Sequence, residues 1–180
     1  MKNDARYTAA QALLRQLGSN AYSNIVIDAL LRQNRLDGRD AAFASALFYG
    51  TLERLLTIDH ILRRYSAKPL GELSPGVLAA LRTGVCQLSY MDGVDDYAAV
   101  SESVNLAKDL GCGRAAGFVN GVLRSFLRDG KAVPPAAGGR LAEWEVRYSC
   151  PAWLIDSWLS AYGEAAALRM LEGSLGKPPV

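Results

Sequence analysis

The sequence predicts an all-α fold: a helical bundle over residues 1–130, a linker over 131–139 and a short helical connector over 140–180. Apolar residues recur every three or four positions along most of the chain, which is the spacing of buried helix faces. Strand-like alternation of apolar and polar residues is nearly absent. The linker is expected because residues 131–139 are rich in proline, glycine and alanine.

Composition and charge limit the class of protein without indicating a function. Half of the 180 residues are hydrophobic, and the net charge of +2 means that nucleic-acid binding would need a local basic patch. No apolar run approaches the roughly 18 residues that a membrane span requires, and the N-terminus lacks a signal-peptide core. We therefore expect a cytoplasmic protein with no membrane partner. Three widely spaced cysteines and a single histidine, His60, predict reduced thiols and no metal site.

The first half of the chain is expected to hold helices at residues 4–17, 21–33 and 37–65, the last with a bend at Gly50. Each helix has one apolar face. The expected core-facing residues are Tyr7, Ala10, Leu13, Leu14 and Leu17, then Ile25, Ile27, Leu30 and Leu31, then Phe43, Leu47, Gly50, Arg54, Ile58, Ile61 and Tyr65.

The second half is expected to begin with a turn over residues 70–74 and a helix that starts at Pro75, with Ser74 as its N-cap. Further helices are expected at residues 98–110, where glycines follow, and at 114–128. Three short helices at 140–148, 151–161 and 164–174 would make up the connector.

The helix expected at residues 114–128 has two contrasting faces. Its second face combines two glycines four residues apart with arginines and an asparagine, although a glycine inside a helix costs about 1 kcal/mol relative to alanine. Such glycines indicate that something packs close to the backbone: an RNA phosphate backbone held by the arginines and the asparagine, or a neighbouring helix. The first face carries Phe118, Val119, Val122, Leu123 and Phe126, and the second Arg114, Gly117, Asn120, Gly121, Arg124 and Arg128.

Other arginines lie among apolar residues. Arg6 falls on the apolar side of the first helix, so it needs a buried partner or lies at the rim of a groove, with Lys2 extending the same basic edge. Arg54 interrupts an apolar stripe, and we expect it to pair with Glu102 because a buried cation requires a carboxylate. Cations also suit the C-terminal end of the long helix, where the chain has Arg63, Arg64 and Lys68.

Several motifs, taken in order, resemble the NusB family over about residues 4–128. They are Asp37-x-Arg39-Asp40-x-x-Phe43, Leu47-x-x-Gly50-Thr51-Leu52, Ile58-Asp59-x-Ile61-Leu62, Leu81-Arg82-x-Gly84-x-x-Gln87-Leu88, Ala99-Val100-x-Glu102-x-Val104-x-Leu106-Ala107-Lys108 and Phe118-Val119-Asn120-Gly121-Val122-Leu123. The resemblance implies a compact helical bundle that binds RNA and partner proteins. One departure is Asp95-Asp96, where the family usually has a proline.

The connector is similar to that of the RsmB/Sun family of ribosomal-RNA cytosine-C5 methyltransferases. The similar residues are Arg147-Tyr148-Ser149-x-Pro151-x-Trp153-Leu154, Trp158, Tyr162-Gly163 and Pro178-Pro179-Val180. The resemblance implies that this chain is the RNA-binding, targeting N-terminal domain of a 16S ribosomal-RNA methyltransferase. The partners would be ribosomal RNA and the protein's own C-terminal methyltransferase domain, which binds S-adenosylmethionine and would lie outside this chain.

These observations together predict an RNA site made of Lys2, Arg6, Arg114, Asn120, Arg124 and Arg128. We expect no catalytic or cofactor site within the chain, because no strand is followed by a glycine-rich loop. Cys150 beside a proline is interpreted as structural rather than catalytic, and the three tryptophans, Trp144, Trp153 and Trp158, as packing residues.

Two other functions are compatible with the bundle. A free-standing NusB-type antitermination factor would bind RNA and a ribosomal protein, but the residues after Gly139 argue against it. A docking module would only brace the catalytic domain. The sequence leaves homodimer formation open.

Overall fold

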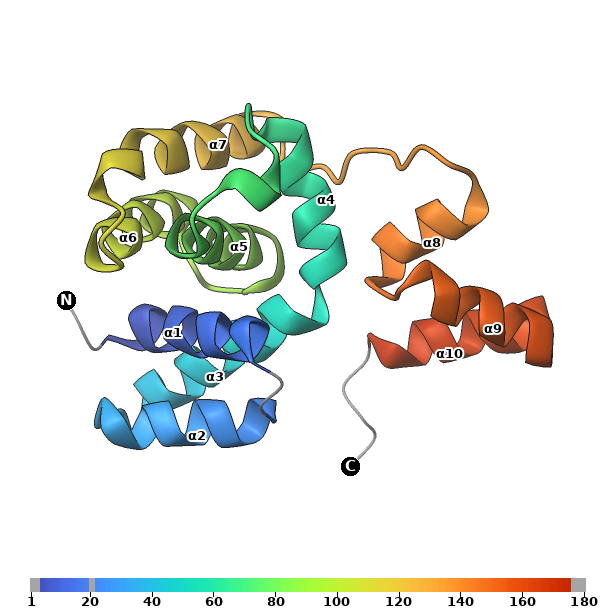
Figure 1. The fold of residues 1–180 in the computed structure, drawn as a ribbon, viewed down its shortest axis with the longest axis horizontal. Helices are drawn as coiled ribbons and strands as arrows, with labels where there is room; N and C mark the ends of the chain where they lie inside the picture. Colours follow the sequence, from blue (N-terminus) through green and yellow to red (C-terminus); the bar gives the residue numbers. More distant parts are fainter. Residues whose placement is uncertain (1–3, 20–21, 176–180) are drawn as a thin grey trace.

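The computed structural model describes residues 4–19 and 22–175, and within these ranges the chain is helical, without a β-strand (Figure 1). The predicted all-α fold is confirmed. The elements are α1 (Ala5–Gly18), α2 (Ser23–Gln33), α3 (Gly38–Glu53), α4 (Leu55–Tyr65), the 3₁₀ helix η1 (Leu70–Glu72), α5 (Pro75–Tyr90), α6 (Asp96–Asp109), the 3₁₀ helix η2 (Gly113–Ala115), α7 (Ala116–Arg128), α8 (Arg140–Tyr148), α9 (Ala152–Tyr162) and α10 (Glu164–Ser174).

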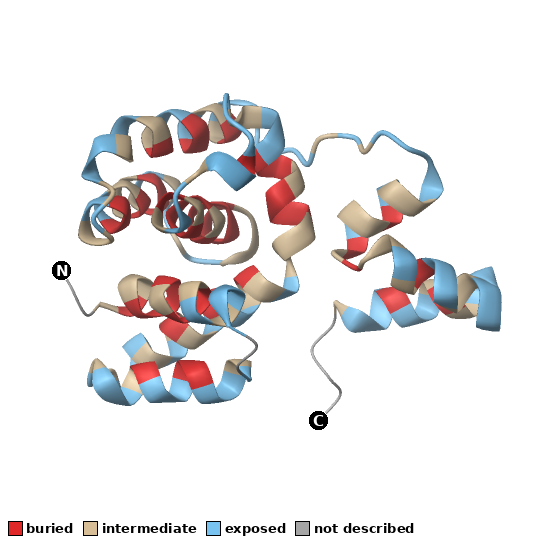
Figure 2. Ribbon diagram, in the orientation of Figure 1, coloured by how far each residue is buried: buried red, intermediate tan, exposed pale blue. Residues whose placement is uncertain are grey.

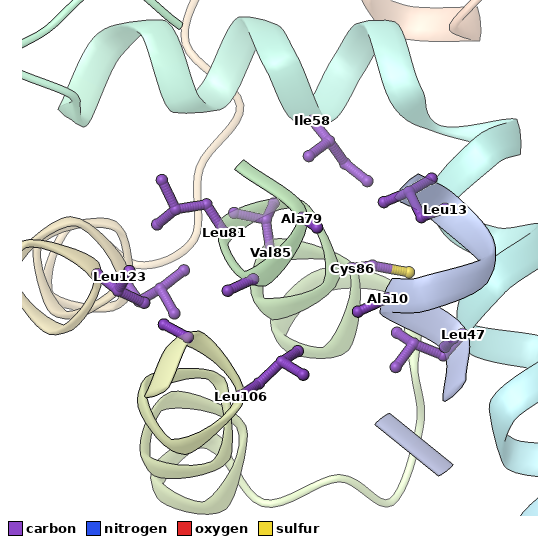
Figure 3. Packing of buried hydrophobic residues seen from close by; sticks show 14 of the residues in the cluster. Ala10, Leu13, Leu47, Ile58, Ala79, Leu81, Val85, Cys86, Leu106 and Leu123 are labelled. Carbon is purple, nitrogen blue, oxygen red and sulfur yellow. The ribbon is translucent and has the colours of Figure 1, made fainter. Parts of the chain in front are cut away.

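Helix α5 forms the centre of the bundle. It packs against α1, α3, α4, α6 and α7, so side chains from all of these surround it (Figure 3). Its sequence suits this position because small and apolar residues occur on every side, and a helix that is apolar all round is buried. The buried residues of α5 are Val77, Ala79, Ala80, Leu81, Thr83, Gly84, Val85, Cys86, Gln87 and Leu88.

A glycine in α5 allows α6 and α7 to approach closely. A Cβ atom added to Gly84 would lie 2.8 Å from Leu123 Cδ1 on α7 and 2.8 Å from Ser103 Oγ on α6. Contacts this short essentially never occur at real Cβ atoms, so a side chain at residue 84 would force the buried Leu123 and Ser103 side chains to shift. The inward face of α7 is thereby fixed on the core, with Val119, Leu123 and Phe126 fully buried.

The long third helix predicted over residues 37–65 is two helices, and the predicted bend at Gly50 is wrong. The break lies at Arg54, where φ is −103° and ψ is 17°, whereas Gly50 stays within α3. The glycine at position 50 is explained by packing instead, because a Cβ atom there would lie 3.4 Å from Cys86 Sγ on α5. Neither glycine nor proline marks the true break.

Two residues expected in the core of the first helices are exposed. Leu17 is 46% exposed at the end of α1, and Ile25 is 61% exposed in the first turn of α2. Among the described residues, no helix is both long and apolar enough to cross a membrane.

The connector helices α8, α9 and α10 form a second, smaller apolar cluster. Its buried residues are Trp144, Tyr148, Cys150, Ile155 and Leu171, against which Trp158 packs. Trp153 was predicted to pack and does not: its side chain is 69% exposed, because it lies on the outer side of α9.

Hydrogen bonds join the connector to α4. Thr57 Oγ1 donates to the Val146 carbonyl over 2.6 Å, and the Leu56 amide donates to Ser149 Oγ over 3.1 Å. The linker is also held, since His60 Nε2 donates to the Pro134 carbonyl over 2.9 Å. Helix α8 therefore lies directly against the bundle.

Candidate nucleic-acid interface

Helix α7 presents one buried face and one open face, as its sequence predicts. Val119, Val122, Leu123 and Phe126 are buried, whereas Gly117, Gly121, Arg124 and Arg128 are exposed and Asn120 is half-buried. The open face lies on the outside of the bundle (Figure 2).

The two glycines of this face have no close neighbour. A Cβ atom added to Gly117 or Gly121 would meet no atom within 4 Å. The interpretation that a neighbouring helix crosses α7 tightly here is therefore wrong for the part of the chain that the structure describes. The close approach that belongs to the core occurs at Gly84, on the opposite side of α7.

Two of the predicted RNA-binding residues are in contact on this face. Arg124 Nε donates to Asn120 Oδ1 over 2.9 Å, which orients the guanidinium along the helix surface. One turn later, Arg128 Nη2 donates to Ser125 Oγ over 3.1 Å. No carboxylate within the described ranges forms a salt bridge with either arginine, so each keeps an uncompensated positive charge that can attract phosphate.

Arg114 lies just before α7, on η2. Its side chain is exposed and lines a surface hollow with Ser74, Val77 and Ala115. Arg114 is exposed like Arg124 and Arg128, but its hollow lies against α5, whereas Arg124 lines a hollow against α6.

Arg6 lies apart from these arginines. Its Nε donates to Gln87 Oε1 over 2.7 Å, and its guanidinium is 4.9 Å from the centre of the Phe43 ring. Its contacts are therefore with α5 and α3, and Figure 1 shows α5 and α6 between α1 and α7. A neutral amide and a ring orient Arg6 without neutralising it.

Lys2 lies outside the described residues. Arg63, Arg64 and Lys68 are exposed at and just beyond the end of α4.

The predicted pairing of Arg54 with Glu102 is wrong. Arg54 ends α3 instead of continuing its buried face, and its guanidinium lies 5.0 Å from the centre of the Tyr90 ring. Glu102 accepts from Asn105 Nδ2 over 3.4 Å on its own helix. Because Arg54 is only half-buried, the aromatic ring and solvent suffice as partners.

Two of the three cysteines, Cys86 and Cys150, have the electrostatics of structural residues. Burial raises the pKa of the Cys86 thiol to about 11, and burial followed by the nearby Glu145 carboxylate raises the pKa of Cys150. A nucleophilic cysteine needs the opposite shift, because the thiolate is the reactive form. Among the described residues, no cluster of three or more histidines, cysteines or acids could hold a metal.

Sequence reasoning missed the residues that complete these surfaces. Gln87 and Phe43 orient Arg6, and Tyr97, on the helix beside α7, is 71% exposed next to Asn120 and Arg124. Only Tyr97 carried a usable signal: a large aromatic residue placed off the apolar stripe of its helix.

Comparison with known proteins identifies the family to which the bundle is similar. Residues 3–128 match the model of the NusB family. The chain is 34% identical to the probable ribosomal RNA small subunit methyltransferase B of Bacillus subtilis, over 94% of this chain and 38% of that protein. It is 33% identical to the transcription antitermination protein NusB of Shewanella amazonensis, over 70% of this chain and 94% of that protein.

A solved structure also resembles the bundle. Antitermination factors NusB and NusE in complex with double-stranded RNA match with a TM-score of 0.64 and 23% identity, over 71% of this chain and 96% of the matched chain. This likeness concerns the fold. The chain spans about two fifths of the length of the methyltransferase that it matches.

Proposed function

The chain belongs to the NusB family, and on that premise we propose that it is the RNA-targeting front part of a cytoplasmic 16S ribosomal-RNA cytosine-C5 methyltransferase. Its partners would be ribosomal RNA and the methyltransferase domain of the same protein. Residues 1–130 would bind RNA, residues 131–139 would link, and residues 140–180 would lead into the catalytic part; residues 176–180 lie outside the described ranges.

The open face of α7 carries the proposal for RNA. It combines two exposed arginines, an asparagine amide and two glycines whose missing side chains leave the helix backbone accessible, and Arg114 lies exposed just before the helix. Arginine side chains and asparagine amides are donors that suit phosphate oxygens. Arg6 would add a second contact on α1, oriented by Gln87. The predicted set is thus Lys2, Arg6, Arg114, Asn120, Arg124 and Arg128.

The extent of the sequence matches supports the methyltransferase over the antitermination factor. The match to the Bacillus subtilis methyltransferase covers 94% of this chain, so it continues well past α7 into the connector. The match to the antitermination protein covers 70% of this chain, about the length of the bundle. Because the connector is shared with a methyltransferase, the sequence favours a methyltransferase over an antitermination factor as the full-length protein.

S-adenosylmethionine would be the cofactor of that parent. The described residues of this chain do not fit it, because they are helical and provide no strand followed by a glycine-rich loop. We therefore assign no catalytic step to this chain.

The RNA proposal is tested by titrating the protein into fluorescently labelled 16S ribosomal-RNA fragments at several salt concentrations. Binding through phosphates should weaken steeply with salt, with a slope of about 0.7–0.9 per contacted phosphate on logarithmic axes. Arg124→Glu should lower the affinity and reduce that slope by about 1.

Arg169→Glu is the matched control, because Arg169 is exposed on α10 and changes the net charge equally. It should leave binding nearly unchanged. Equal affinity of folded Arg124→Glu and wild-type protein would remove Arg124 from the site.

Sequencing the native reading frame beyond Val180 tests the choice of parent. Continuation into a strand, a glycine-rich loop and a cysteine-containing loop is expected. A stop codon within a few residues would contradict the methyltransferase and support the antitermination factor.

A further inference from the structure

A surface hollow lies between α6 and α7, next to the proposed phosphate contacts. Its volume is about 230 Å³, and residues of both helices line it. Val100 and Val104 contribute apolar surface, whereas Ser101, Asn105, Asn120 and Arg124 contribute polar groups. The seventh lining residue, Tyr97, lies in the first turn of α6.

Tyr97 does not contribute to the packing of the described part of the chain. Its side chain is 71% exposed, and it makes no hydrogen bond or ring contact with a described residue. An exposed aromatic ring beside a basic surface is the device by which proteins hold unpaired bases, because every base can stack on it.

The two sides of the hollow differ in charge. The segment that begins α6 carries Asp92 and Asp95, both exposed, and Asp96, which Lys131 neutralises over 3.0 Å. The α7 side carries Arg124, whose terminal nitrogens have no described partner, and the Asn120 amide. A phosphate is therefore attracted to α7 and repelled from the start of α6, whereas a neutral base is tolerated there.

We propose that this hollow holds one unpaired base of a single-stranded RNA, stacked on Tyr97, while Asn120 and Arg124 hold the adjoining phosphate. The proposal rests on the proposed function and makes it more specific. Valine side chains would contact the base, and Ser101 and Asn105 would lie near its edge. A duplex does not fit this arrangement, since its bases are stacked inside and only its phosphates would reach the hollow.

The test compares Tyr97→Ala, Tyr97→Phe and the wild type for binding to a labelled single-stranded oligoadenylate, by fluorescence anisotropy over a salt series. Loss of a stacked ring should weaken binding roughly 5- to 150-fold. The phenylalanine variant keeps the ring and should bind like the wild type. The salt dependence of Tyr97→Ala should stay unchanged, because no phosphate contact is removed.

Tyr22→Ala provides a matched control, because Tyr22 is 76% exposed and lies at the start of α2, which packs on α1 and α3. It should bind normally. Circular dichroism confirms that each variant is folded, as expected for exposed positions.

Different failures separate the two proposals. If Arg124→Glu weakens binding but Tyr97→Ala does not, stacking on Tyr97 is refuted and the RNA-binding function stands. Tighter binding of a duplex than of the single strand, unaffected by Tyr97→Ala, would also refute the stacking site. If the wild type binds neither RNA at low salt, both proposals fail.

Discussion

Replacing Gly121 with alanine should stabilise the protein while weakening its binding to RNA. Gly121 lies in the middle of α7 and is exposed to solvent, and a Cβ atom added to it would meet no atom within 4 Å. The substitution therefore introduces no clash and removes the conformational freedom of glycine in the unfolded chain, for a gain of about 1 kcal/mol. For a chain of this length, the melting temperature should rise by about 2–4 °C.

The same methyl group should obstruct a phosphate backbone that approaches α7. If it displaces one charge-assisted hydrogen bond to RNA, the loss is about 1.5–3 kcal/mol, or roughly a tenfold to hundredfold lower affinity. Thermal unfolding and anisotropy titration on the same samples measure the two effects. Gly173→Ala is the control, because Gly173 is exposed on α10 with nothing within 4 Å, so it should affect only stability.

Opposite signs for stability and RNA affinity would be difficult to explain by a structural role alone. A variant that is more stable and binds RNA as tightly as the wild type would refute close approach of RNA to this glycine. A destabilised variant would refute the open surroundings of Gly121 from which the reasoning starts.

Three further substitutions test the packing, the connector and the buried thiol. Gly84→Ala should lower the free energy of unfolding by about 1–3 kcal/mol, because its Cβ would lie 2.8 Å from Leu123 Cδ1; an unchanged melting temperature would contradict this. Thr57→Val removes the 2.6 Å hydrogen bond to the Val146 carbonyl and should cost about 1 kcal/mol, seen as faster amide hydrogen exchange in α8. Cys86 has its pKa raised from 9.0 to about 11, so its contribution to stability is complete below pH 9 and is lost as pH rises to 11. At about 1.4 kcal/mol per pKa unit, the loss is about 3 kcal/mol, and Cys86→Ala should lose less stability over that range in alkaline unfolding.

Much of the fold could be predicted because the buried and exposed faces of a helix are determined by residues close together in the sequence. The stripes that face α5 and the two faces of α7 follow from spacing alone, and Pro75 marks the start of α5. The break at Arg54 could not be predicted, because the residues around it favour a helix, and the two helices differ only in their neighbours: α3 packs on α1 and α5, and α4 on α5, α7 and α8. Ile25 shows the related limit: its place on an apolar stripe does not determine whether another element covers it.

Part of the candidate site could likewise be predicted from the sequence and part could not. The open face of α7 could be predicted, since its arginines and glycines share one helix. The orientation of Arg6 could not, because its partner Gln87 is 81 positions away in the sequence. Tyr97 could not be assigned to the site either, because Asn120 and Arg124, on α7, become its neighbours only when the chain folds.

The position of the connector bears on what an RNA-binding bundle could do for a following domain. Residues 131–139 have the composition of a flexible tether, yet Lys131 pairs with Asp96 and His60 holds the Pro134 carbonyl. Helix α8 is then fixed on α4 through Thr57 and through Ser149, and α4 itself packs on α7. A series of anchored elements therefore runs from the arginine face to the connector. RNA held on α7 would present its neighbouring nucleotides in a set direction relative to α8, which a freely moving tether would not achieve.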